Sequence, residues 1–177
     1  MTEIICSGFG GQGVLTAGLI LADAAMEAGQ YVTWYPSYGS EMRGGTANCN
    51  VILSDTPVGS PIVQHPNVLM VMNNPSLDKY EDTVAPGGKI FVDSTLIGRK
   101  VRRTDVEAYY IPATGLAGEM GVPTLANMLL LGALVEKTGC VRFDSIAPAL
   151  HKVIPARKAD LFDVNMKAVE AGKAYQG

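Results

Sequence analysis

Charged side chains are scarce in this 177-residue chain. They make up 18% of the residues, below the roughly 25% that is typical of soluble domains. The 14 lysines and arginines are scattered rather than clustered, which disfavours a nucleic-acid-binding face or a polybasic membrane segment. The hydrophobic fraction of 47% excludes a disordered chain. So few charges hint at a surface buried against partners, although a well-packed monomer is equally compatible with the composition.

Cysteine and histidine are also rare. The chain has three cysteines and two histidines, all far apart: Cys6, Cys49, Cys140, His65 and His151. No C-x-x-C pair and no ligand spacing occurs among them, so the sequence indicates neither an iron–sulfur cluster nor a zinc or other metal site. We expect the cysteines to be small buried hydrophobic residues in a reducing cytoplasm.

Long apolar runs and a secretory signal are missing as well. The longest run, residues 125–135, is interrupted only by Asn127 and is far shorter than the ~20 residues of a membrane span. The first residues, Met-Thr-Glu-Ile-Ile-Cys, carry no positive region of a signal peptide. We therefore expect a cytoplasmic protein with no membrane segment.

Apolar stretches and helical segments alternate along the whole chain. We expect strands at residues 3–7, 31–35, 46–53, 67–72, 89–92 and 106–111, and helices at 14–28, 75–80, 123–138, 144–151 and 157–171. This alternation predicts one α/β domain over residues 1–177, Rossmann-like, with a mostly parallel sheet and helices on both faces. Residues 46–53 alternate polar and apolar side chains, so we expect a half-exposed, antiparallel excursion around residues 46–62.

A glycine loop follows the first expected strand. Gly8-Phe9-Gly10-Gly11-Gln12-Gly13 matches G-x-G-x-x-G, whose glycines allow close backbone approach and whose helix start offers free N–H groups to an anion. A dinucleotide site also needs an acidic residue at the end of the second strand. That strand ends in Tyr35-Pro36-Ser37, so NAD or FAD binding is disfavoured. A tight structural turn, an anion site and a subunit contact remain as alternatives.

A second glycine-rich segment follows the second expected strand. It reads Ser37-Tyr38-Gly39-Ser40-Glu41-Met42-Arg43-Gly44-Gly45. In a parallel sheet it should emerge at the same carboxyl edge as the first loop. Arg43 could there offer a fork of donors to a phosphate or a carboxylate. The alternative is that Arg43 pairs with Glu41 on the surface while Tyr38 packs on the core.

Two further polar residues stand out, although no catalytic constellation can be assembled. Asn127 is polar within an apolar helix, so its amide should have a hydrogen-bond partner, and structural use is favoured over catalysis. Glu119 lies among glycines in the segment 115–121 and could be a site carboxylate, but a solvated loop carboxylate is commoner. The sequence itself therefore predicts no catalytic residue.

The two glycine segments together resemble a known family. Gly8–Val14 followed by Tyr38–Gly45 is similar to the gamma subunit, or gamma domain, of 2-oxoacid:ferredoxin oxidoreductases. The resemblance extends to the helix around Asn127 and to the C-terminal helix, and so covers essentially the whole chain. It implies cofactor-binding residues in both segments and in the apolar helix: Gly10, Gly11, Gln12, Gly13, Tyr38, Gly39, Glu41, Arg43, Gly44 and Asn127.

The resemblance also implies a division of labour. Alpha and beta subunits hold thiamine diphosphate, iron–sulfur clusters lie on another subunit, and ferredoxin accepts the electrons. The complex oxidatively decarboxylates a 2-oxoacid and transfers the acyl group to coenzyme A. This chain would be inactive alone, would contact coenzyme A at most, and would serve a 2-oxoglutarate enzyme first, with pyruvate or branched-chain 2-oxoacid enzymes as alternatives. A stand-alone nucleotide-binding protein and a pure scaffold subunit are the alternatives of other classes.

Overall fold

The computed structural model describes residues 1–37, 46–155 and 158–177. In chain order its elements are β1 (Thr2–Phe9), α1 (Val14–Glu27), β2 (Tyr31–Ser37), β3 (Thr46–Ser54), β4 (Val68–Val71), α2 (Asn74–Tyr80), η2 (Glu81–Thr83), β5 (Lys89–Asp93), β6 (Glu107–Ile111), α3 (Ala113–Glu119), η3 (Pro123–Leu125), α4 (Ala126–Thr138), η4 (Phe143–Ser145), α5 (Ile146–Val153) and α6 (Asp160–Ala174). Most bounds lie within a few residues of those expected from the sequence.

The described strands form one sheet in the order β2-β3-β1-β4-β5-β6. The pairs β1–β4, β4–β5 and β5–β6 are parallel, whereas β3 runs antiparallel to both of its neighbours. The predicted α/β fold with an antiparallel excursion is therefore confirmed. All four residues of β4 are buried, as expected for the continuous apolar run of a strand covered on both faces.

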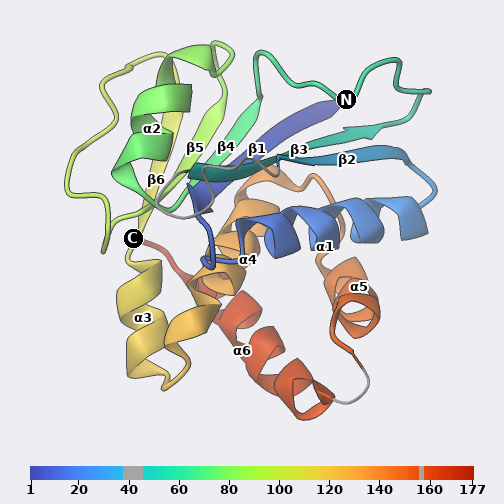
Figure 1. Cartoon of the computed structure of the whole chain (residues 1–177), viewed down its shortest axis with the longest axis vertical. Helices are drawn as coiled ribbons and strands as arrows, with labels where there is room; N and C mark the ends of the chain where they lie inside the picture. Colours follow the sequence, from blue (N-terminus) through green and yellow to red (C-terminus); the bar gives the residue numbers. More distant parts are fainter. Residues whose placement is uncertain (38–45, 156–157) are drawn as a thin grey trace.

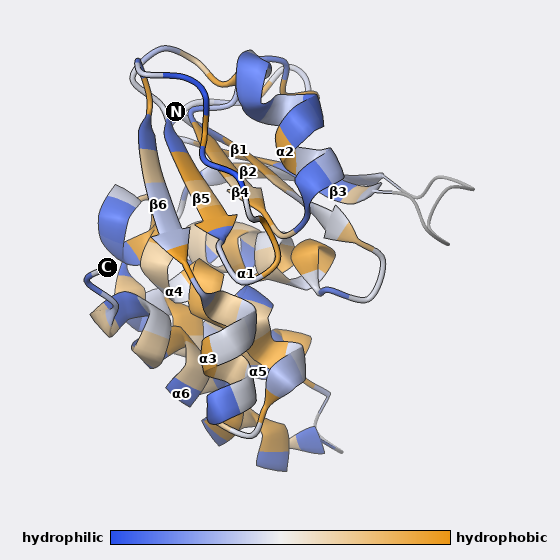
Figure 2. Ribbon diagram, turned by 90° about the vertical axis from the view of Figure 1, so that its left-hand side faces the viewer, coloured by the Kyte–Doolittle hydropathy of each residue, from blue (hydrophilic) through white to orange (hydrophobic). Residues whose placement is uncertain are grey.

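Helices cover the two faces of the sheet unequally (Figure 1). Helices α1, α4, α5 and α6 lie on one face, and α2 lies on the other. Side chains alternate along each strand, so Ile4 and Cys6 of β1 point into the larger core, and Ile5 points into the smaller core beneath Leu77 of α2. Figure 2 shows hydrophobic colouring on the central strand β5 and also on parts of the helices that pack below the sheet.

Strand β3 is more buried than its alternating sequence predicts. Its apolar set packs under α1 as expected, but Ile52 and Ser54 on the opposite face are only 2% and 3% exposed. The segment after β3 folds back over that face, where Val63 is buried and its N–H donates to Asn50 Oδ1 at 2.8 Å. The prediction of a half-exposed strand is wrong because this connecting segment acts as a cover.

The glycine-rich segment before α4 is also different from the prediction. The segment 115–121 was expected as a loop around Glu119, but residues 113–119 form helix α3. Gly115 and Gly118 are tolerated there because helices accept glycine at a modest cost. The segment then turns at Gly121, where φ is 73°. Within the described residues no helix is long and apolar enough to cross a bilayer.

Candidate functional site

The glycine loop connects β1 to α1 at the carboxyl edge of the sheet. Gly11 and Gly13 have φ values of 92° and 76°, in the left-handed region that side-chain-bearing residues rarely adopt. Gly13 is the N-cap residue of α1. The loop therefore presents bare backbone beside the helix start, as its sequence predicts.

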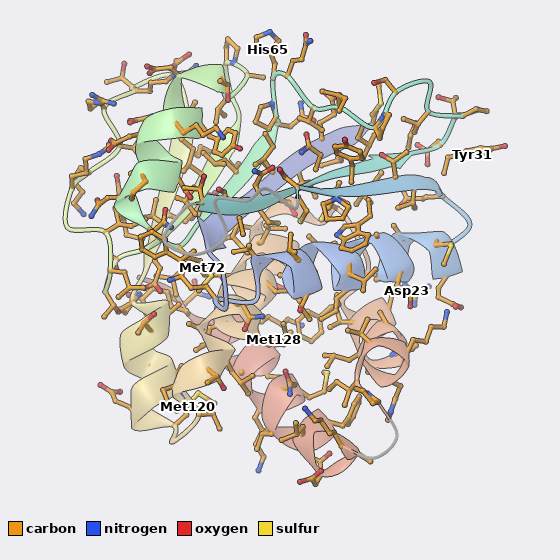
Figure 3. The ribbon with its side chains drawn as sticks, viewed as in Figure 1. Asp23, Tyr31, His65, Met72, Met120 and Met128 are labelled. Atoms are coloured by element: carbon orange, nitrogen blue, oxygen red, sulfur yellow. The ribbon has the colours of Figure 1, made fainter. Side chains whose placement is uncertain are left out.

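Gln12 holds the loop in shape with its side-chain amide. Its Oε1 accepts a hydrogen bond from the N–H of Phe9 at 2.6 Å, and its Nε2 donates to the carbonyl of Met72 at 3.0 Å. Met72, which is labelled in Figure 3, directly follows β4. The Gln12 amide therefore joins the ends of two adjacent parallel strands. The carboxyl edge of β1 and β4 is thereby fixed.

Asn127 reaches the same loop from the first turn of α4. Its Nδ2 donates to the carbonyl of Gly13 at 3.0 Å, and its side chain is almost fully buried. Its Oδ1 has no hydrogen-bond partner among the described residues. The expected structural use of this amide is confirmed, and the predicted contact of Asn127 with a cofactor stays a prediction.

Gly13→Ala should lower the free energy of unfolding by about 2 kcal/mol. The left-handed backbone costs an alanine about 1 kcal/mol or more, and the new Cβ would stand 2.3 Å from Asn127 Nδ2, adding about 1 kcal/mol of overpacking. The coupling free energy between Gly13 and Asn127 is measured by a double-mutant cycle. Urea unfolding is recorded for the single variants Gly13→Ala and Asn127→Ala and for the double variant. We expect the double variant to lose at least about 0.5 kcal/mol less than the sum of the two singles.

Gly11→Ala is the matched control for this cycle. Gly11 has a similar backbone conformation, but a Cβ there would meet nothing within 4 Å. It should lose only the backbone cost of about 1 kcal/mol and show no coupling to Asn127→Ala. Additive losses for Gly13→Ala and Asn127→Ala would contradict the contact described above.

The start of α1 is a positive helix end. Its N-cap residue, Gly13, has no side chain to cap it, and its first turn contains no acidic residue. The free N–H groups and the dipole of a 14-residue helix favour an anion there. A hollow of about 320 Å³ lies against this turn, lined among others by Gly10, Gly11, Thr16 and Ala47. The geometry therefore suits a phosphate or a carboxylate.

A second hollow lies on the other side of the loop. It measures about 240 Å³, and its lining includes Gly11, Gln12, Met72, Leu96 and Thr114. The chain leaves β1 toward α1 on one face of the sheet and leaves β4 toward α2 on the other. The crevice between two such strands is where open α/β sheets bind ligands. Its described lining carries no charged side chain, so it suits a neutral group.

Half of the predicted site residues lie outside the described residues. These are Tyr38, Gly39, Glu41, Arg43 and Gly44. The residues that flank them, Ser37 and Thr46, lie at the carboxyl edge, where Thr46 pairs with Phe9 of the glycine loop. Gly10, Gly11, Gln12, Gly13 and Asn127 are brought together at that edge, as the contacts above show.

The sheet order gives a second reason against a dinucleotide site. The antiparallel β3 lies between β1 and β2, so the end of β2 is two strand spacings, roughly 10 Å, from β1. In the dinucleotide fold the acidic residue stands on the strand adjacent to β1. In this chain β2 ends without an acidic residue, and β2 is not adjacent to β1.

Asp93 was not predicted from the sequence to lie at the carboxyl edge of the sheet. It ends β5, is fully buried, and its carboxylate accepts hydrogen bonds from the N–H of Thr95 at 3.1 Å and from Thr114 Oγ1 at 2.5 Å. It thereby anchors α3 beside the second hollow. The sequence signal that could have identified Asp93 is a carboxylate at the end of a buried apolar strand.

The cysteines take the structural places expected of them. Cys6 and Cys49 are directly opposite on β1 and β3 and fully buried, and Cys140 is half-buried. The contact with Cys49 and the burial raise the pKa of the Cys6 thiol well above its ordinary value. The described part of the chain has no group of three or more His, Cys, Asp or Glu side chains that could hold a metal.

Known proteins are similar to this chain over nearly its whole length. Residues 3–175 match the model of the family described as pyruvate ferredoxin/flavodoxin oxidoreductase. The chain belongs to this family. The resemblance recognised in the glycine segments is therefore confirmed at family level.

Two relatives differ in how much of their length the chain covers. It is 43% identical over 171 residues to the ketoisovalerate oxidoreductase subunit VorA of Methanothermobacter thermautotrophicus, covering 96% of this chain and 35% of that protein. It is 38% identical over 156 residues to the 2-oxoglutarate synthase subunit KorC of Methanocaldococcus jannaschii, covering 86% of this chain and 83% of that protein. The chain thus spans about a third of the VorA relative and most of the KorC relative.

Two solved structures share the fold over nearly the whole chain. The gamma subunit of a keto/oxoacid ferredoxin oxidoreductase from Geobacter sulfurreducens has a TM-score of 0.83 and 30% identity, covering 97% of this chain and 96% of that chain. A 2-oxoglutarate:ferredoxin oxidoreductase from Magnetococcus marinus, with 2-oxoglutarate, coenzyme A and succinyl-CoA bound, has a TM-score of 0.87 and 25% identity. It is matched over 98% of this chain and 30% of that chain. The predicted fold class is confirmed by both.

Proposed function

We propose that this chain is the gamma subunit of a 2-oxoacid:ferredoxin oxidoreductase complex in the cytoplasm. The complex converts a 2-oxoacid and coenzyme A into acyl-CoA and carbon dioxide and passes the electrons to ferredoxin. This chain supports assembly and lines the coenzyme A cleft with its glycine loop. It carries no catalytic residue and is inactive alone.

The start of α1, whose N-cap residue is Gly13, carries this proposal. Coenzyme A bears phosphates, and a helix N-terminus with free N–H groups stabilises such anions. Thr16 and the backbone of Gly10 and Gly11 line the hollow at this place. Arg43, from the segment between β2 and β3, would add charge-assisted donors. The matched Magnetococcus marinus protein was solved with coenzyme A bound, which supports this ligand class.

The partners follow from the same proposal. Alpha and beta subunits hold thiamine diphosphate, and an iron–sulfur subunit passes the electrons on. The chain's own cysteines fit this division, because Cys6 and Cys49 are buried in the core beneath α1 and are not accessible. The cysteine ligands of an iron–sulfur cluster would have to converge on one accessible point.

We propose 2-oxoglutarate as the 2-oxoacid substrate of the complex. The KorC relative is a 2-oxoglutarate synthase subunit by name, and the matched Magnetococcus marinus structure is a 2-oxoglutarate:ferredoxin oxidoreductase. Both support the 2-oxoglutarate type, whereas the VorA relative supports the ketoisovalerate type. Ketoisovalerate and pyruvate remain the alternatives, and turnover of the purified complex with each 2-oxoacid decides among them.

Thr16→Asp tests the anion site with two effects of opposite sign. Thr16 is the third residue of α1, where a carboxylate interacts favourably with the helix dipole and stabilises a protein by about 0.5 kcal/mol. The same charge would repel a phosphate in the hollow that Thr16 lines. We expect the assembled complex to show a KM for coenzyme A raised about tenfold, while the chain melts at a slightly higher temperature. Steady-state kinetics and thermal unfolding measure the two effects.

Thr16→Asn is the matched neutral control and should change the KM for coenzyme A little. The isolated chain serves as the baseline and should show no 2-oxoacid decarboxylation; activity there would overturn the division of labour. A stabilised Thr16→Asp variant with normal coenzyme A kinetics would favour the pure scaffold role. Tight NAD or FAD binding would favour the stand-alone nucleotide-binding protein.

A further inference from the structure

Strand β2 forms one edge of the sheet of the described residues. It pairs with β3 on one side, and no other strand of the described residues pairs with its second side. Its seven residues, Tyr-Val-Thr-Trp-Tyr-Pro-Ser, contain no charged side chain. Natural proteins usually protect exposed edges with charges, prolines, bulges or a cover, because unpaired N–H and C=O groups recruit another strand; of these devices β2 carries only Pro36, next to its last residue. The opposite edge, β6, carries Glu107 in an ion pair with Lys89.

The two faces of β2 have different surroundings. Val32 and Trp34 lie opposite Leu53 and Val51 of β3 and pack on the core under α1. The alternate residues Tyr31, Thr33 and Tyr35 therefore point to the other face of the sheet.

The two tyrosines of that face are about half exposed, at 51% for Tyr31 and 47% for Tyr35. Figure 3 shows Tyr31 extending away from the body of the molecule. Exposed tyrosines are typical of the central residues of protein interfaces.

We propose that β2 pairs antiparallel with β2 of a second copy of this chain, about a twofold axis at Thr33. In this register Thr33 meets its own counterpart, Tyr31 meets the second copy's Tyr35, and Val32 meets the second copy's Trp34. Threonine–threonine, aromatic–aromatic and aromatic–β-branched cross-strand pairs are all favourable. The strand is therefore complementary to itself at each of the five residues 31–35.

The surroundings of this ladder also favour a second copy. Residues 31–37 are uncharged, so like charges do not face each other within the ladder itself. Pro36, which has no N–H, falls at the end of the ladder, where its missing donor matters least. A self-complementary patch is what a closed twofold interface requires. The pairing lies at the β2 edge and does not use the glycine loop, so it stands independently of the proposed coenzyme A role.

Charge substitution at Thr33 tests the twofold register. Sedimentation equilibrium of the 177-residue chain should show a reversible dimer. Thr33→Lys and Thr33→Glu each place like charges directly opposite one another and should weaken dimerisation at least about tenfold. An equimolar mixture of the two variants should regain the dimer as a heterodimer, because opposite charges then face each other.

Leu161→Lys is the matched control. Leu161 is an exposed apolar residue of α6, and its substitution should leave the dimerisation constant unchanged. A wild-type chain that stays monomeric throughout the concentration range would overturn the proposal, as would a dimer that neither Thr33 variant weakens. If the charged variants fail to fold by circular dichroism, Thr33→Cys replaces them. This variant should form a disulfide-linked dimer on mild oxidation by diamide, and the absence of that crosslink would equally overturn the register.

Discussion

Gly132→Ala is expected to lower the free energy of unfolding by about 3 kcal/mol. Gly132 of α4 and Gly172 of α6 lie where the two helices cross, and a Cβ on Gly132 would stand 1.9 Å from the carbonyl oxygen of Val169. A Cβ on Gly172 would stand 1.8 Å from the carbonyl oxygen of Leu129. Both obstacles are backbone atoms, so the helices themselves must separate. The midpoint of urea unfolding measures the loss, which we expect for either substitution.

Gly118→Ala is the matched control for the helix crossing. Gly118 lies in α3 and is exposed, and a Cβ there would meet nothing within 4 Å. Because alanine is the better helix former, this variant should gain about 0.5–1 kcal/mol. A gain at Gly132 similar to that at Gly118 would show that helix propensity, rather than the close crossing, decides the effect.

The crossing also matters for the candidate site. Helix α4 begins at Ala126, and the next residue, Asn127, holds the carbonyl of Gly13. A helix displaced by Gly132→Ala would move this amide relative to the loop. The tight contact of α4 with α6 therefore positions the glycine loop from the far side of the core.

Local sequence patterns were sufficient for most of the fold. The glycines at 11, 13, 29 and 139 adopt positive φ values where a turn or a helix end was expected, because this requirement depends on the residue itself. The strand bounds followed from apolar periodicity. Helix α3 was missed because Gly115 and Gly118 suggest a loop, whereas packing of Ala113 and Ala117 against the core stabilises the helix.

The candidate site was only partly predictable because its contacts are long-range. The loop of residues 8–13 is a local motif and was recognised. That Asn127 would need a partner could be expected, but not that the partner would be Gly13, 114 residues away. The cover over β3 and the anchor at Asp93 likewise depend on how distant segments fold together. No local pattern encodes them.

Glu81→Gln is expected to destabilise the chain by about 3 kcal/mol at neutral pH. Glu81 is fully buried, and its carboxylate lies 2.8 Å from Arg99 and 3.3 Å from Arg102, besides accepting a hydrogen bond from the N–H of Arg102. This value lies at the lower end of the stability losses measured when a buried ion pair is broken. The side chains of Arg99 and Arg102 are 28% and 64% exposed, so water can replace part of their contact with the carboxylate. Chemical unfolding of the variant measures it.

Asp78→Asn is the matched control, because Asp78 also pairs with Arg99, at 2.6 Å, but is 60% exposed. It should cost less than about 1 kcal/mol, as exposed ion pairs do. An effect of Asp78→Asn as large as that of Glu81→Gln would contradict the assigned importance of burial.

The pH dependence separates the charge of Glu81 from its packing. Burial alone would raise the pKa of Glu81, but hydrogen bonds from the Arg102 N–H and from Arg99, with the charge of Arg99, outweigh it and lower the pKa below its ordinary 4.5. The folded state therefore binds this proton less readily than the unfolded chain. The carboxylate's contribution is fully present above pH 4.5 and is lost as the pH falls through the lowered pKa. The stability difference between wild type and Glu81→Gln should accordingly stay constant from neutral pH to about pH 5 and shrink below it; a difference that persists unchanged in acid would assign the effect to packing.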